Sequence, residues 1–129
     1  MSCTVTKVPG IPVSRGVAEF KFACVGTVGS VFLSASQAAD IIGMRALLLE
    51  SIPGTGAAVP ATYTVSIINT KGSILATSGP RSKTLTQLVE CNRNTASFYP
   101  VVTANIGISV SALDIGNTAD IYLTFLKNL

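Results

Sequence analysis

The segment from Pro53 to Pro60, PGTGAAVP, comes nearest in this sequence to a ligand-binding loop. A glycine-rich loop cradles a phosphate when a Lys and a Ser or Thr follow its second glycine and a helix begins there. Neither residue follows Gly56, and a β-branched run comes after Pro60. A dinucleotide site would need a third glycine and a helix. The segment is therefore predicted to be a connecting loop, long enough to reach a neighbouring subunit.

Side chains that perform catalysis or hold metal ions are few here and form no recognisable pattern. The chain has no histidine, which removes the usual general base and the commonest metal ligand. Ser-His-Asp and Cys-His sites are therefore impossible within one chain, and the cysteines lack zinc-ligand spacing. Asp114 and Asp120 flank the turn DIGNTAD, which offers fewer oxygen ligands than a calcium loop needs. We predict no enzymatic activity, no metal and no cofactor.

The cysteines bear on where the protein is made. There are three, Cys3, Cys24 and Cys91, and they lie far apart in the sequence. A secreted disulfide framework has an even and denser set. The sequence therefore predicts reduced thiols in a protein made in the cytosol. Cys24 is expected to face the core as a small apolar residue.

The chain carries little charge for its size. Charged residues make up 12% of it, against about 25% in an average soluble domain. Apolar residues make up 48%, which excludes a disordered chain. Interface cores are depleted in charge, so a subunit covered by its neighbours explains both values. We expect a homo-oligomer, or a subunit that becomes well ordered only on a larger particle.

A membrane protein is the other class that low charge indicates, and the sequence argues against it. The charge-free runs 51–70 and 94–113 are both broken by proline and by glycine or polar residues. Neither is a span of roughly 20 apolar residues. The N-terminal segment lacks the basic start and apolar stretch of a secretory signal. The net charge is only +3 and the basic residues are scattered, so we predict no nucleic-acid surface.

Short apolar segments separated by Gly, Pro, Asn and Ser run along the chain, a pattern typical of an all-β domain. In Val17–Val25 and Ala61–Asn69 apolar and polar residues alternate, as in strands with one buried side. In the second segment we expect Tyr63, Val65 and Ile67 inside, and Thr62, Thr64 and Ser66 outside. NTKG predicts a tight turn with Gly72 at positive φ. Ser34–Gly43 is the one candidate helix, capped by Ser36.

These elements predict a single domain over residues 1–129. Its fold is expected to be all-β, an antiparallel β-sandwich or small barrel of seven to eight strands with at most one short helical turn. Residues 1–16 are expected to form an extended N-terminal arm.

The segment Met44–Ile52 has leucines on both faces. A strand that is apolar on both sides is covered on both sides, by its own domain or by a neighbour. Strict alternation places Arg45 on one face with Leu47 and Leu49, and Leu48 on the other. This segment therefore supplies candidate contacts between subunits.

Two later segments supply further candidates. Arg81 lies in TSGPRSKT, which is predicted to be a solvated polar loop, with contact to an anion or partner as the alternative. Phe98 and Tyr99 are predicted to anchor the start of a strand in the core, with an exposed contact patch as the alternative. The full set of candidate subunit contacts is Arg45, Leu48, Gly54, Gly56, Pro60, Arg81, Phe98 and Tyr99.

The segments Ile41–Ser82 and Ala104–Leu126 contain an ordered series of motifs. A Gly-led strand is followed by a PG…P loop, a Tyr-x-Val-x-Ile strand, an Asn-x-x-Gly turn, and a glycine loop with an arginine. The residues that match are Pro53, Gly54, Pro60, Tyr63, Gly72, Gly79 and Arg81. In this order the chain resembles a family of small β-rich proteins encoded among the structural genes of tailed bacteriophages. The arginine loop departs from the family pattern, because it is shorter and has Pro80 before Arg81.

The resemblance implies a structural protein of the virion, made in the host cytoplasm. The expected function is that of a capsid decoration or cement protein, packed in many copies against other virion proteins such as the major capsid protein. A neck, tail or baseplate component is the alternative. A soluble carbohydrate- or ligand-binding β module is an alternative from a different class. Such modules present exposed Trp or Tyr, whereas this chain has no Trp and three Tyr.

Overall fold

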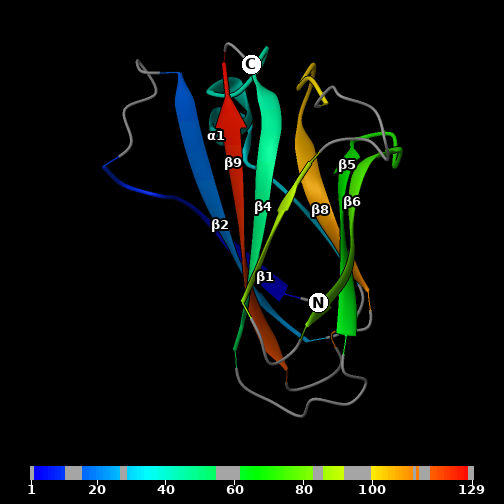
Figure 1. Ribbon diagram of the computed structural model, residues 1–129. Helices are drawn as coiled ribbons and strands as arrows, with labels where there is room; N and C mark the ends of the chain where they lie inside the picture. Colours follow the sequence, from blue (N-terminus) through cyan, green and yellow to red (C-terminus); the bar gives the residue numbers. More distant parts are fainter. Residues whose placement is uncertain are drawn as a thin grey trace.

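The computed structural model describes residues 2–10, 16–26, 29–54, 62–82, 86–91, 100–111, 113 and 117–127. These residues form two antiparallel sheets that face each other (Figure 1). The order in sheet A is β1 (Ser2–Lys7), β2 (Val17–Val25), β9 (Thr118–Leu126), β4 (Arg45–Pro53) and β7 (Gln87–Glu90). The order in sheet B is β3 (Gly29–Phe32), β8 (Ile106–Ser111), β5 (Thr62–Asn69) and β6 (Ile74–Ser82). The predicted all-β sandwich is confirmed, and the described strands do not close into a barrel.

The strand order is that of a double-sheet jelly roll. From β2 onward, one sheet reads 2-9-4-7 and the other 3-8-5-6, as two Greek keys folded on each other would. The chain changes sheet at every connection after β2 except the β5–β6 hairpin. Each sheet is therefore assembled from strands that are distant in the sequence.

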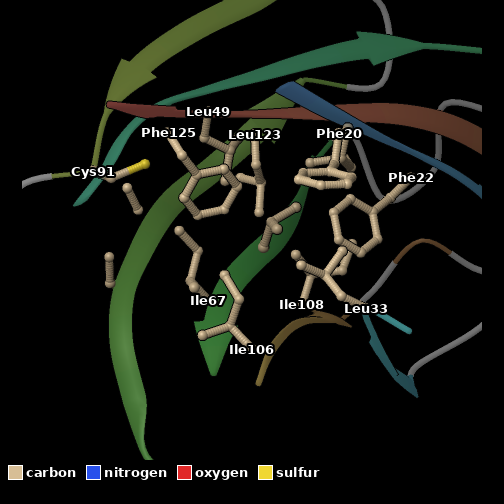
Figure 2. Packing of buried hydrophobic residues seen from close by; sticks show 14 of the residues in the cluster. Phe20, Phe22, Leu33, Leu49, Ile67, Cys91, Ile106, Ile108, Leu123 and Phe125 are labelled. Carbon is tan, nitrogen blue, oxygen red and sulfur yellow. The ribbon is translucent and has the colours of Figure 1, made fainter. Parts of the chain in front are cut away.

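The core lies between the sheets and is built from alternate residues of the central strands (Figure 2). In β2, Phe20 and Phe22 are fully buried, and Phe20 meets Phe125 of β9 edge to face, with ring centroids 6.1 Å apart. Burying one such side chain contributes about 1.5–3 kcal/mol. In β5 the predicted inward residues are confirmed, because Tyr63, Val65 and Ile67 are at most 1% exposed.

Strand β4 contains a bulge, and the bulge corrects the predicted facing of its residues. The register with β9 runs from Ala46 opposite Phe125 to Leu48 opposite Thr124, so β4 holds one residue more than its partner there. As a result Arg45 and Leu48 share the outer face, whereas Leu49 is buried. Strict alternation is wrong here because the inserted residue shifts every later residue of the strand to the opposite face.

Of the segment predicted to be a polar loop around Arg81, residues 77–82 are instead the second half of β6, and residues 83 and 84 lie outside the described ranges. Strand β6 is an edge strand of sheet B, and its register with β5 shifts next to Pro80. Proline has no N–H to donate, so edges and bulges are the places where a sheet accepts it. Arg81 then lies opposite Tyr63 and is buried rather than solvated.

The β5–β6 turn follows the prediction. Gly72 has a φ of +83°, which suits a residue without Cβ. The side-chain oxygen of Asn69 accepts hydrogen bonds from the backbone N–H groups of Lys71 and Ser73, at 3.0 and 2.9 Å. This Asx turn fixes the hairpin.

The predicted helix is shorter than its segment. Helix α1 spans Ala35–Ala39 and its cap is Ser34, so the assignment of Ser36 is wrong. The Ser34 hydroxyl accepts from the N–H of Gln37 at 3.2 Å, and the Gln37 side chain accepts from the N–H of Ser34 at 3.0 Å. This reciprocal capping box starts the helix two residues earlier than expected.

The N-terminal segment contributes a strand of its own. Of residues 1–16, expected to form an arm, Ser2–Lys7 form β1 and pair with β2, while residues 11–15 lie outside the described ranges. Two contacts tie β1 to the helix region: Gln37 Nε2 donates to Val5 O at 3.3 Å, and Lys7 Nζ lies 3.3 Å from a carboxylate oxygen of Asp40.

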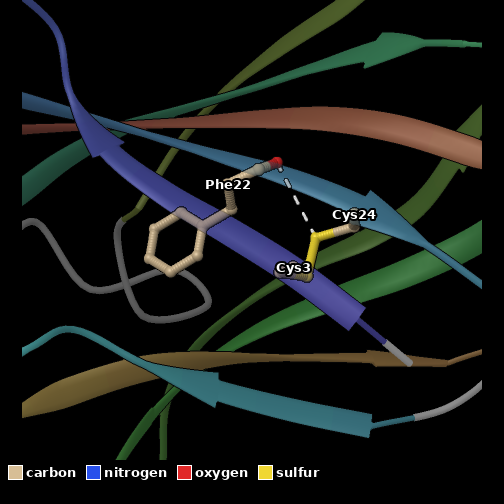
Figure 3. Close-up of a disulfide and its surroundings, with 3 residues drawn as sticks. All are labelled: Cys3, Phe22 and Cys24. Carbon is tan, nitrogen blue, oxygen red and sulfur yellow. Dashed lines mark hydrogen bonds between the residues drawn. A yellow bond between two sulfur atoms is a disulfide. The ribbon is translucent and has the colours of Figure 1, made fainter.

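A disulfide joins Cys3 of β1 to Cys24 of β2 (Figure 3). The two residues are direct partners in the antiparallel register, with Cα atoms 4.1 Å apart, as expected for a non-hydrogen-bonded pair. The prediction of reduced thiols is wrong for these two cysteines because strand pairing, which their spacing does not reveal, brings them together. Cys24 faces the core as predicted, and Cys91 is a free, buried thiol.

Candidate interaction surface

The predicted contact residues do not gather at one place. Arg45 and Leu48 are half-buried on the outer face of sheet A. Gly54 follows β4, where its N–H donates to Thr118 O at 3.0 Å. A Cβ at this position would lie 2.8 Å from that oxygen, so glycine is needed for close approach to β9 rather than for a turn. Four of the predicted contact residues lie outside the residues that the structure describes, namely Gly56, Pro60, Phe98 and Tyr99.

Arg81 lies inside the subunit. One guanidinium nitrogen, Nη2, donates to Ser78 O at 2.8 Å, and Nε is buried without a hydrogen-bond partner among the described residues. The hydroxyl of Tyr63 is buried in the same way. Burial raises the pKa of Tyr63 above its ordinary value, and the nearby Ser51 side chain and the charge of Arg81 partly offset this rise. Arg81 therefore belongs to a buried polar group, not to an exposed contact.

The outer face of sheet A is charged and internally paired. Lys21 Nζ lies 3.6 Å from Asp120 and 6.0 Å from the ring centroid of Tyr122. Thr124 donates to a carboxylate oxygen of Glu19 at 3.1 Å. Partly exposed ion pairs of this kind contribute only about 0–1 kcal/mol. Several charges of this face are therefore paired within the face itself.

The outer face of sheet B has a different composition, and the strand register arranges its side chains in three rows across the strands. The first row is apolar and runs from Phe32 through Gly107 and Ile68 to Ile74. The second row consists of hydroxyl side chains, and the third adds two more hydroxyls and a proline. We call this surface the neutral face; its residues are Phe32, Gly107, Ile68, Ile74, Ser30, Ser109, Ser66, Thr77, Ser111, Thr64 and Pro80.

In the apolar row, Gly107 has no side chain, so the ring of Phe32 can lie against the backbone of β8. A Cβ at Gly107 would lie 2.8 Å from the Phe32 Cα and 2.9 Å from its ring carbon Cδ1. The ring therefore lies against the backbone of β8, where any other residue would push it away. Phe32 is 37% exposed and Ile74 is 57% exposed at the two ends of the row. The row is thus accessible at its two ends, whereas Ile68 between them is 6% exposed.

The two outer faces differ sharply in charge. In the four strands of sheet B the single charged residue is Arg81, which points inward. In contrast, Glu19, Lys21, Arg45, Glu50 and Asp120 all lie on the outer face of sheet A. The neutral face can therefore bind through apolar contact and hydroxyl hydrogen bonds, but not through ion pairs. Sequence analysis missed this surface because its rows join four separate parts of the chain.

Other kinds of site are not apparent in the part of the chain that the structure describes. In those ranges no three His, Cys, Asp or Glu side chains gather closely enough to hold a metal ion. No helix among the described residues is long and apolar enough to cross a membrane. In comparisons with known proteins, no family model and no curated protein matches the chain.

Proposed function

We propose that this protein is a non-enzymatic structural subunit of a tailed-bacteriophage virion, packed in many copies against other virion proteins. The observation that carries the proposal is the neutral face, in which none of the described outward residues of the four strands of sheet B is charged. A large exposed surface without charge is favoured where another protein covers it, since charged residues are depleted in the centres of interfaces.

Three further observations support the proposal. The double-sheet jelly roll occurs in viral capsid domains as well as in lectins and cupins, so the topology is compatible with a virion protein without fixing the function. The segments that resemble phage structural proteins, Ile41–Ser82 and Ala104–Leu126, supply most of the strands of this sandwich. The absence of histidine from the chain agrees with a non-enzymatic role.

Within the virion, we propose that the protein decorates or cements the capsid. A small subunit whose neutral face is covered by a neighbouring subunit would be suited to packing in many copies on the capsid. A subunit at the neck, tail or baseplate would use the same surfaces, so location has to be measured directly.

The test is to follow the chain in purified particles of the virus that encodes it. Particles are separated on a density gradient, washed in high salt and analysed by quantitative mass spectrometry, with a non-structural protein of the same lysate as the control. We expect this chain to remain with full particles at high copy number while the control is lost. Immunogold labelling then separates head from tail. A chain that is absent from washed particles would overturn the proposal.

A further inference from the structure

We propose that the neutral face is a self-association surface on which a second copy of this chain docks with its own neutral face. The inference deepens the proposed function, and it rests on that function for its biological role. Its physical basis lies in the charges, hydrogen-bonding groups and edges of the described sandwich.

Charge selects the partner surface. An ion placed against the neutral face loses its water and meets no opposite charge, which costs several kcal/mol per fully buried ion, by order of magnitude. The outer face of sheet A would bring Glu19, Lys21 and Glu50 into such a contact. A second neutral face brings no charged side chain from its four strands into the contact. The neutral face therefore complements itself better than it complements the outer face of sheet A, and a pairing of two neutral faces is two-fold symmetric.

The hydroxyl groups of the neutral face also favour a second copy as the partner. A hydroxyl donates and accepts, whereas an ammonium only donates and a carboxylate only accepts. The second row of the neutral face is formed by hydroxyls alone, and within it Ser66 Oγ and Thr77 Oγ1 lie 3.5 Å apart. Two copies of such a row can hydrogen-bond to each other in either sense, so the surface needs no chemically different partner.

The edges of the sheets offer no competing route of association. Strand β6 carries Pro80 and two register shifts, and Val5 O on β1 is bound by Gln37. The remaining edge strands, β3 and β7, have four residues each. Short strands, proline and covered edges all disfavour pairing with another chain, which leaves the faces.

The size of the neutral face sets the strength of the dimer. Four strands about 4.8 Å apart and three rows about 6.6 Å apart give a flat footprint of roughly 400 Å². A standard interface removes about 800 Å² from each partner. The contact is therefore about half the standard size, below the range of stable interfaces, and we expect a weak, transient dimer that dissociates in the micromolar range.

The test compares sedimentation velocity of three proteins between 1 and 200 μM, as order-of-magnitude limits around the expected range. Thr77→Lys adds a charge to the neutral face, and Thr4→Lys is its matched control, because both threonines are exposed and lie on edge strands of different sheets. We expect the parent and Thr4→Lys to dimerise equally and Thr77→Lys to bind at least about tenfold more weakly. Circular dichroism and the melting temperature check that all three fold.

Three results would overturn the inference: a parent protein that stays monomeric throughout, equal association of the two variants, or steep weakening by salt. The last follows because a contact without ions should change little between low and high salt. Failure here is distinguishable from failure of the proposed function. A monomer found in washed particles refutes the face-to-face dimer alone, whereas a dimer that is absent from particles refutes the virion role alone.

Discussion

The Cys3–Cys24 disulfide closes a loop between the first two strands, and the length of that loop sets its contribution to stability. With a sequence separation of 21, the chain-entropy estimate is about 3 kcal/mol. We predict that Cys3→Ala lowers the free energy of unfolding by up to about this amount, measured in urea. Reductant should lower the stability of the parent protein and leave the variant unchanged.

Thiol titration of the unfolded parent gives an independent check on the disulfide. Without reductant we expect the one free thiol of Cys91, and after reduction all three cysteines. Three reactive thiols before reduction would contradict the assignment.

Cys91 predicts a specific loss of stability in alkali. Burial raises the pKa of this thiol from its ordinary value of 9.0 to about 12. Between these values the unfolded chain has released the proton and the folded chain has kept it, so stability falls as pH rises, by about 1.4 kcal/mol per pH unit. Urea denaturation at pH 8 to 11 should show this extra slope in the parent and not in Cys91→Ala. The pKa of Tyr63 is also raised, but this residue changes the pH dependence of stability equally in the parent and in Cys91→Ala. Parallel curves would argue against a buried, protonated thiol.

At the scale of the element, β5 provides a test of register with two adjacent residues. Val65 is fully buried, and Val65→Asp would place an unpaired carboxylate in the core, at a cost of several kcal/mol. Thr64 is its outward neighbour on the neutral face, and Thr64→Asp should cost within about 1 kcal/mol in the dilute monomer. Free energies of unfolding from denaturant titration check the difference. Similar values for the two would mean that the strand is slipped by one residue.

Strands differ in how far their sequence reveals them. Val17–Val25 and the core of β5 could be predicted because apolar and polar residues alternate without interruption. In β4 the bulge near Leu47 breaks the alternation, and in β6 the Gly-Pro-Arg segment reads as a loop although edge pairing holds it in the sheet. A signal for β1 was present in the alternation of Cys3 and Val5 with Thr4 and Thr6.

At the scale of the whole molecule, composition indicates that a covered surface exists, but only the topology shows where it lies. Low charge indicates that some surface is covered, but it does not say which one. The neutral face exists because the jelly roll brings together Phe32, Ser66, Thr77 and Ser109 from four strands. None of these residues is distinctive in its own segment, so single-segment patterns cannot find the surface. The candidate contacts that the structure describes, Arg45, Leu48, Gly54 and Arg81, do not belong to this face for the same reason.

The position of β9 has a consequence for how the chain folds during its synthesis. Strand β9 lies in the middle of sheet A, and its partner register extends to Val17 opposite Leu126. Pairings between such distant residues form slowly, on a scale of about milliseconds to seconds in all-β proteins. Until the ribosome has made Thr118–Leu126, the emerging chain carries Phe20 and Phe22 without the strand that completes their sheet. The nascent protein therefore exposes apolar segments that chaperones can bind and that promote aggregation at high expression.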